Sequence, residues 1–373
     1  MAQPGIRAGS AGGWLGGHIR GRGNVPLSTN PVPALMSTGT LMLEFTLERG
    51  QTGPLPLLHY ATRDGWPRLL SLSLTAEGRF ALSQRQGDAL STLSLGAEAE
   101  AAAGGRMRLS WSWDGPARRS QLTLEALDDG TLRLRTGVDP LPVPRDDVLA
   151  LLAASGPARL GAQVEWLAIG TQIQPVGPGA CFAPSTLLET PQGPRPASVI
   201  RAGDWVETAD AGPQQVLWSG RISLPSLGAL RPVRLCAPSF GRANDLWVLP
   251  HQRIAISGAS VEYLFGDDEV LVEARHLVDG CTALQPDQPA VLGWQGILLK
   301  RHHLLIADGC RMESLFSGGL ARHPAIAAKT ALADLAATGQ LPLHRDPARR
   351  ALCAYEAMTL VSNRAQGRGP IAA

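Results

Sequence analysis

Hydrophobic residues alternate with polar or small residues in several short runs of the first half of the chain. The clearest runs lie at 41–47, 70–74 and 107–113, and 164–170 has the composition of a closing strand. Alternation with a period of two buries one face of a strand and leaves the other face in solvent. These runs therefore predict antiparallel strands, and many short strands joined by turns favour a β-sandwich.

Turn and helix signals fit the same architecture. Glycines close the short loops at 76–78 and 128–130, as hairpins require. The proline-rich stretch 140–144 leads into 145–153, which predicts a rigid turn and a short helix inserted in the sandwich. The run Ser-Trp-Ser-Trp-Asp-Gly within 106–134 resembles laminin-G and concanavalin-like sandwich modules.

A stretch rich in Gly and Pro, residues 175–179, separates this half from the rest. It combines stiff and permissive residues and has no apolar face to bury, which is typical of a linker between domains. Toward the C-terminus, 325–337 is rich in Ala and Leu, and Asp346-Pro347 predicts the N-cap and first position of a helix over 348–360. We therefore expect the last part of the chain to be helical.

Composition narrows the class of protein. The chain has 373 residues, 44% hydrophobic and 18% charged, and a formal net charge of +2. This balance is ordinary for a soluble globular protein and indicates neither a nucleic-acid partner nor a membrane surface. Residues 1–30 contain no apolar run of signal-peptide length, and no run approaches the roughly 18 residues that span a bilayer. We expect no membrane span and no classical signal peptide, so a cytoplasmic location and export by a non-classical route both stay open.

One of the five cysteines occupies a position with chemical meaning. The cysteines are widely spaced without a Cys-x-x-Cys pair, which supports neither a disulfide framework nor a zinc site, and no cofactor or metal is expected. Cys181 directly follows the linker, where the carbonyl carbon of Ala180 is the electrophile within easy reach of its sulfur. A thiol loses its proton near neutral pH and its thiolate is a strong nucleophile. The position predicts self-cleavage at the Ala180–Cys181 bond.

Several segments that begin at this cysteine resemble the Hint domain, the module shared by Hedgehog proteins and inteins. They follow the order of blocks in the bacterial branch of that family and are Cys181-Phe182, 190–193, 201–204, 205–210, 245–253, 264–270, 274–278 and 298–309. The resemblance implies an all-β, horseshoe-like module. We therefore expect a mainly β chain with a flexible tail (1–30), a β-sandwich (31–176), a linker (177–180), a Hint domain (181–320) and a helical C-terminal extension (321–373).

The resemblance also implies a histidine that shuttles the proton and ends a Ser/Thr-x-x-His block. Here Leu249 takes the position of the hydroxyl and Gln252 that of the histidine, while His251 stands one residue early. In a strand, a displacement by one residue turns a side chain to the opposite face. His251 can then act as the shuttle only if Pro250 creates a bulge or bend; otherwise it is an ordinary histidine at a strand end.

Further residues are candidates through the same resemblance. His302 is preferred as the histidine that assists the acyl shift, although counting back from Asp308-Gly309 favours His303, and both could be solvated strand residues. His276 and Asp204 could orient the site, but a structural histidine and an aspartate that caps backbone amides in its turn are the simpler interpretations. Cys236 and Cys310 could take over the acyl group, yet nothing in their spacing favours this over burial.

Two functional hypotheses follow. The chain has no His-Asn pair, so complete intein splicing is excluded, and Hedgehog-type cleavage remains: Cys181 attacks Ala180, and water, a thiol or an alcohol resolves the thioester. The N-terminal domain would be the intramolecular substrate of a single-turnover reaction, an enzyme only in a loose sense. The alternative is a degenerate, non-cleaving Hint module that supports a carbohydrate- or surface-binding sandwich, with Trp66, Trp111 or Trp113 stacking on a sugar unless these rings belong to the core.

Overall fold

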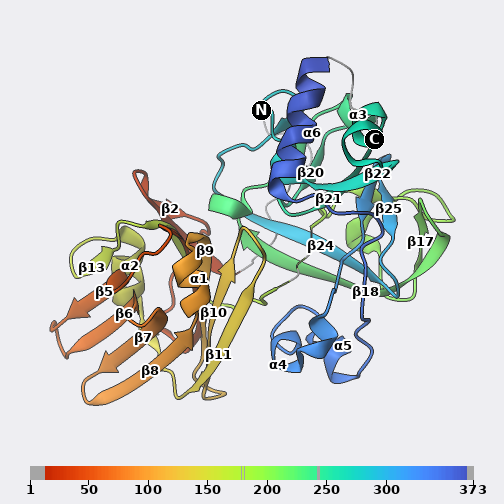
Figure 1. Cartoon of the computed structure of the whole chain (residues 1–373). Coiled ribbons are helices and arrows are strands. Elements are labelled where there is room, and N and C mark those ends of the chain that lie inside the picture. The colour runs from red at the N-terminus through yellow and green to blue at the C-terminus, as the bar shows by residue number, and fades with distance from the viewer. Residues whose placement is uncertain (1–12, 178, 180, 242–243, 368–373) are drawn as a thin grey trace. The chain divides into compact units, whose positions relative to one another are not determined.

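The computed structural model describes residues 13–177, 179, 181–241 and 244–367. The chain divides into two compact units, one ending at Gln174 and the other beginning at Pro175, and each is described by itself (Figure 1). Both consist mainly of antiparallel strands, which confirms the predicted fold class. Within the described part of the chain, no helix is long and apolar enough to cross a bilayer.

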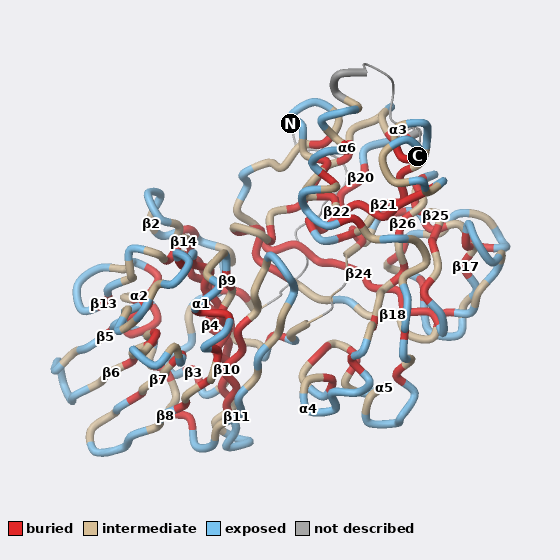
Figure 2. Tube along the Cα trace, viewed as in Figure 1, coloured by how far each residue is buried: buried red, intermediate tan, exposed pale blue. Residues whose placement is uncertain are grey.

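The first unit is a β-sandwich. Its elements are β1 (Trp14–Ile19), β2 (Gly23–Pro26), β3 (Leu35–Met36), β4 (Thr38–Leu47), β5 (Leu55–Thr62), β6 (Arg68–Leu74), β7 (Arg79–Gln86), β8 (Ala89–Gly96), α1 (Glu98–Ala103), β9 (Gly105–Asp114), β10 (Arg119–Ala126), β11 (Leu132–Val138), β12 (Val143–Pro144), α2 (Arg145–Ala153), β13 (Ala158–Leu160) and β14 (Val164–Gly170). One sheet has the strand order β11-β10-β9-β4-β14-β1-β2 and the other β13-β5-β6-β7-β8. The inward residues of both sheets share one apolar core, seen as buried segments in Figure 2.

The predicted strands of this unit are confirmed. Runs 41–47, 70–74, 107–113 and 164–170 all lie in strands, and both glycine loops close hairpins, β6–β7 and β10–β11. The rings of Trp111 and Trp113 are 0% and 1% exposed and stack with centroids 4.3 Å apart. These two tryptophans are therefore core residues and cannot contact a sugar.

The expectation of a flexible tail over residues 1–30 is wrong for residues 14–26. These residues form β1 and β2, and β1 pairs with β14 inside the sheet. Trp14 is fully buried, and Gly16 lets the strand approach α2, since a Cβ at this position would lie 3.1 Å from Leu152. Glycines in place of apolar residues hide the alternation on which the prediction depended. Residues 1–12 lie outside the described part.

The second unit contains two further antiparallel sheets. Its elements up to residue 313 are β15 (Leu187–Leu188), β16 (Arg195–Pro196), η1 (Ala197–Val199), β17 (Trp205–Thr208), β18 (Gly212–Pro225), η2 (Gly228–Leu230), β19 (Val233–Leu235), η3 (Ser239–Gly241), β20 (Leu246–Val248), β21 (Arg253–Ser257), α3 (Ala259–Phe265), β22 (Glu269–Glu273), η4 (Ala274–Leu277), β23 (Ala283–Leu284), β24 (Val291–Leu299), β25 (Leu304–Ala307) and β26 (Cys310–Glu313). The larger sheet has the order β22-β21-β26-β25-β17-β18-β24, and β20-β19-β23 forms the smaller. Phe182 bridges both through Val248 and Gln295.

The C-terminal part is helical but is not a separate appendage. It contains η5 (Leu320–Arg322), α4 (Pro324–Ala327), α5 (Ala333–Ala337) and α6 (Ala354–Gly367). The predicted helix start at Asp346-Pro347 is wrong, because Arg350 to Leu352 instead pair with Leu271 through main-chain hydrogen bonds of 2.8 and 2.9 Å. Leu352 and two residues of α6, Ala357 and Leu360, are buried in the core formed by the sheets.

Candidate functional site

Cys181 is fixed by β24 at the beginning of the second unit. The N–H groups of Cys181 and Phe182 both donate to the carbonyl oxygen of Gln295, at 3.2 and 3.0 Å, and the N–H of Gln295 donates back to Phe182 at 2.8 Å. Phe182 is 2% exposed and belongs to the core. The nitrogen that would leave in the predicted cleavage is thus held in place by a backbone acceptor.

His251 faces this cysteine. The Nε2 atom of His251 lies 3.3 Å from the Sγ atom of Cys181. The residues Leu249 to Gln252 form a turn between β20 and β21, closed by a hydrogen bond of 3.0 Å from the Gln252 N–H to the Leu249 carbonyl. Since His251 lies in a turn, the alternation of strand faces does not decide where its ring points, and the early position in the sequence does not turn the ring away.

Main-chain contacts on several sides hold this turn. The Leu249 N–H donates to the Cys181 carbonyl at 3.2 Å, and the carbonyls of Pro250 and Gln252 accept from Arg275 and Ala274, both at 2.9 Å. Gln252, which stands where the resembling family has its histidine, is buried, and its amide donates at 3.1 Å to the backbone carbonyl of Glu313. Gln252 therefore supports the turn that carries His251. Leu249 is buried, and its hydrocarbon side chain supplies no hydroxyl at this position.

Burial is the largest influence on the Cys181 thiol. It raises the pKa of the thiol well above its usual range, the negative charge of Glu313 raises this pKa further, Arg253 acts in the opposite direction, and Glu273 adds a smaller upward contribution. A thiol in this environment stays protonated at neutral pH, and a protonated thiol is a poor nucleophile. Any attack by Cys181 therefore requires a base next to the sulfur, the position that His251 occupies.

Glu313 connects the turn to His302. Its carboxylate accepts from the Arg253 N–H at 3.2 Å and lies 3.3 Å both from the guanidinium of Arg253 and from Nε2 of His302. The Nδ1 atom of His302 accepts a 2.8 Å hydrogen bond from the Ala348 N–H, so Nε2 carries the proton and donates to the Ser314 carbonyl at 3.1 Å. Backbone groups thus engage both nitrogens of this buried ring. A catalytic role for His302 remains a prediction.

The neighbouring candidates have other partners. His303, the alternative to His302, places Nδ1 3.3 Å from the Asp210 carboxylate. His276 lies in η4, with Nε2 4.0 Å from Glu273. The Asp204 carboxylate accepts from the Arg201 N–H at 3.0 Å, which is the capping contact typical of an aspartate in such a turn. Orienting roles for His276 and Asp204 stay predictions.

Three further residues of the predicted site are Cys236, Cys310 and Ala180. Cys310 is buried and its sulfur contacts the Phe240 carbonyl at 3.3 Å, while Cys236 is partly buried at the end of β19. Ala180 lies outside the described residues. On its N-terminal side, the Gly179 carbonyl oxygen lies 3.4 Å from the sulfur of Cys181, so the backbone just before the predicted cleavage point passes close to the thiol.

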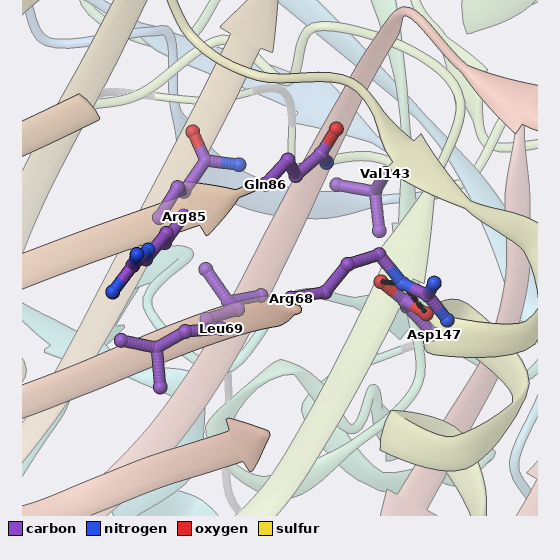
Figure 3. Close-up of a pocket in the computed structure, with 8 residues that line it drawn as sticks. Arg68, Leu69, Arg85, Gln86, Val143 and Asp147 are labelled. Atoms are coloured by element: carbon purple, nitrogen blue, oxygen red, sulfur yellow. Dashed lines mark hydrogen bonds and ion pairs between the residues drawn. The ribbon is translucent and has the colours of Figure 1, made fainter. Parts of the chain in front are cut away.

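The first unit has a small polar pocket of its own, shown in Figure 3. Arg68 contacts Asp147 at 3.0 Å, and Tyr60 donates to the same carboxylate at 2.5 Å. Burial, followed by the hydrogen bond to Asp147, raises the pKa of Tyr60 to about 12. Gln86 donates to the carbonyl of Pro142. These groups satisfy one another, which is the arrangement of a structural network that fastens α2 to the sheet.

The second unit matches a known family. A family model described as "Hint domain" matches residues 180–319, and no curated protein matches the chain. Solved structures that are similar include the CBM40 module of a Ruminococcus gnavus IT-sialidase (17% identity, TM-score 0.25, covering 37% of this chain and 78% of that one). They also include a bacterial intein-like domain from Clostridium thermocellum (12%, 0.24, 37% and 99%) and the LG1-3 region of the laminin α2 chain (12%, 0.25, 77% and 61%). These structural likenesses are too low to carry an argument, and the family match identifies residues 180–319 as a Hint domain.

Proposed function

We propose that this Hint domain cleaves its own chain between Ala180 and Cys181 and thereby releases the N-terminal sandwich. The observation that carries the proposal is the 3.3 Å separation between Cys181 Sγ and His251 Nε2. A proton can pass directly between a donor and an acceptor at such a distance. The family match supports the same reaction class, because Hedgehog-type processing starts from the cysteine at the beginning of the domain.

The first step would be an N-to-S acyl shift. The Nε2 atom of neutral His251 takes the proton of the Cys181 thiol as the sulfur bonds to the carbonyl carbon of Ala180. The C–N bond of the tetrahedral intermediate then breaks, and the same proton passes to the departing nitrogen. That nitrogen already bonds the Gln295 carbonyl at 3.2 Å, and the new amine keeps an N–H for this acceptor. The products are a thioester at Cys181 and a free amine on the same residue.

The second step would be attack on the thioester by an external acceptor. Water, a thiol or an alcohol bonds to the Ala180 carbonyl carbon, its proton goes to the sulfur, and the carbon–sulfur bond breaks. The fragment that ends at Ala180 leaves as an acid, a thioester or an ester, and Cys181 recovers its thiol. The reaction happens once per chain, and most of its acceleration comes from attacking and attacked atoms that are neighbours in the sequence.

Burial and Glu313 disfavour the free thiolate, so the sulfur is protonated at rest, and His251 can take its proton as the bond to the Ala180 carbonyl carbon forms. The alternative of a degenerate module depended chiefly on the displacement of His251, and the turn geometry removes that argument. The absence of a hydroxyl at Leu249 remains and is expected to slow the reaction.

Purified full-length protein on a denaturing gel tests the proposal. Incubation with excess dithiothreitol is expected to produce two fragments, residues 1–180 and 181–373, from the native chain. A Cys181→Ala chain should stay intact, while Cys281→Ala, which removes an exposed cysteine, should cleave like the native chain. A native chain that stays intact under these conditions, or a Cys181→Ala chain that is cut, would refute the proposed reaction.

A further inference from the structure

The linker before Cys181 is held by residues that lie beyond the family match. The N–H of Val176 donates to the carbonyl oxygen of Lys329 at 3.1 Å. Lys329 follows α4, in the stretch of chain after the matched span, which ends at residue 319. The segment that carries the predicted cleavage point is thus fastened on its N-terminal side by the C-terminal extension.

The acceptor carbonyl belongs to a well-ordered turn. Lys329 lies between α4 and α5, where its N–H donates to the Ile326 carbonyl at 2.8 Å. The hydroxyl of Thr330 donates to Ala327 at 2.8 Å and accepts from the Leu332 N–H at 3.1 Å. These hydrogen bonds fix the turn through the Lys329 N–H and the Thr330 hydroxyl. The Lys329 carbonyl oxygen accepts from the Val176 N–H of the linker.

An apolar cluster anchors this turn to the sheet. Leu332 is fully buried and packs with Leu320, Leu335 and Leu341 against Leu298 of β24. The same strand carries Gln295, which accepts the N–H of Cys181. One rigid strand therefore supports both ends of the short segment that joins Val176 to Cys181.

Gly179 has a defined neighbour. A Cβ at Gly179 would lie 3.1 Å from the Cδ1 atom of Ile222 on β18, so the backbone at Gly179 passes closely over this side chain. Contacts that hold both ends of a peptide segment lower the backbone entropy that is lost when the reacting groups align. Reactions between groups held in this way gain rate because the entropy of alignment is already lost.

We propose that residues 320–341, the C-terminal clamp, position the linker so that the Ala180 carbonyl meets the Cys181 thiol, with Val176 as the positioning residue. The inference rests on the proposed cleavage and assigns part of it to residues outside the Hint family match. The clamp acts on the N-terminal side of the bond, while β24 holds the nitrogen. A chain without the clamp contact would keep the Cys181–His251 pair and lose the alignment of the carbonyl.

Hydrogen exchange tests the contact without any cleavage. In full-length Cys181→Ala protein, read amide by amide, the N–H of Val176 is expected to exchange at least tenfold more slowly than in an unstructured peptide. Adding Leu332→Ala, which loosens the clamp, should speed exchange at Val176 and leave Phe182, bonded to Gln295, unchanged. Exchange at Val176 as fast as in a free peptide overturns the clamp, whether or not the native chain cleaves. Protection at Val176 in a chain that never cleaves supports the clamp contact and refutes only the proposed reaction.

Single-turnover rates test the positioning role. Val176→Pro removes the N–H donor, whereas Val176→Ala keeps it and serves as the matched control. Loss of one hydrogen bond of ordinary net strength is expected to make cleavage by dithiothreitol about fivefold to tenfold slower in the proline variant than in the alanine variant. Equal rates in the two variants would overturn the positioning role.

Discussion

Replacing His251 by glutamine is the sharpest test of the chemistry at the site. Glutamine keeps a polar side chain in the turn and can accept a hydrogen bond from the thiol, but it cannot take the proton. Burial and Glu313 keep the thiol of Cys181 protonated, so the attack step needs a base to remove its proton. The His251→Gln chain lacks the imidazole that lies beside the sulfur. The variant should fold, because the turn is held by main-chain contacts and by the Gln252 side chain rather than by the imidazole.

The size of the effect follows from the role of the imidazole. A positioned general base contributes about a hundredfold to ten-thousandfold to a rate. With Nε2 3.3 Å from the sulfur and the thiol disfavoured as an anion, we expect the His251→Gln chain to cleave about a hundredfold to a thousandfold more slowly than the native chain. This corresponds to about 3 to 4 kcal/mol of lost transition-state stabilisation.

The assay is a single-turnover time course in excess dithiothreitol, quantified on a denaturing gel. His59→Gln is the control, since His59 is an exposed residue of β5 in the sandwich, and its rate should match the native rate. A His251→Gln chain that cleaves within about threefold of the native rate would show that His251 is not the proton acceptor.

Three further predictions concern reactivity and stability. Iodoacetamide should modify Cys181 at least tenfold more slowly than the exposed Cys281 at pH 7.5, measured by peptide mass spectrometry, because each unit of raised pKa lowers the thiolate fraction tenfold; equal rates would contradict the partly buried, protonated thiol. Asp147→Ala should destabilise the sandwich by about 3 to 5 kcal/mol in urea unfolding, since it leaves the partly buried Arg68 without its counter-charge and the buried Tyr60 hydroxyl without its acceptor; a loss below about 1 kcal/mol would contradict this. Leu360→Ala should cost about 2 to 4 kcal/mol in the unfolding of the second unit, whereas exposed Met358→Ala should be nearly neutral; equal effects would show that α6 lies outside the core.

Strands with regular alternation could be predicted from the sequence, and strands without it could not. In β4 and β9 every second side chain is a large apolar residue that fills the shared core, so the pattern and the structure report the same physical fact. In β1 the adjacent Trp14 and Leu15 are both buried and two glycines follow them, so the strand shows no alternation, and close packing of Gly16 on Leu152 takes its place. At the C-terminus, pairing with Leu271 outweighs the local helix signal at Asp346, because a tertiary hydrogen-bond partner is invisible to local propensity.

Some residues of the candidate site could likewise be predicted from the sequence, and others could not. The position after the linker indicated Cys181 and the family blocks indicated His251, but the direction of the His251 ring depends on a turn that the sequence suggested only through Pro250. Sequence reasoning missed Gln295 and Lys329 altogether, because both act through backbone carbonyls, which every residue possesses. The carboxylate of Glu313 was also missed, since it reaches the site only through the pairing of β21 with β26.

Hydroxylamine trapping of the thioester tests the central claim most directly. Hydroxylamine attacks thioesters far faster than amides, so native full-length protein treated near neutral pH is predicted to release one N-terminal fragment that carries a hydroxamate on Ala180, identified by intact mass and fragmentation. The Cys181→Ala chain should release none. A native chain that stays intact in hydroxylamine, or a fragment that ends at any other residue, would contradict the account.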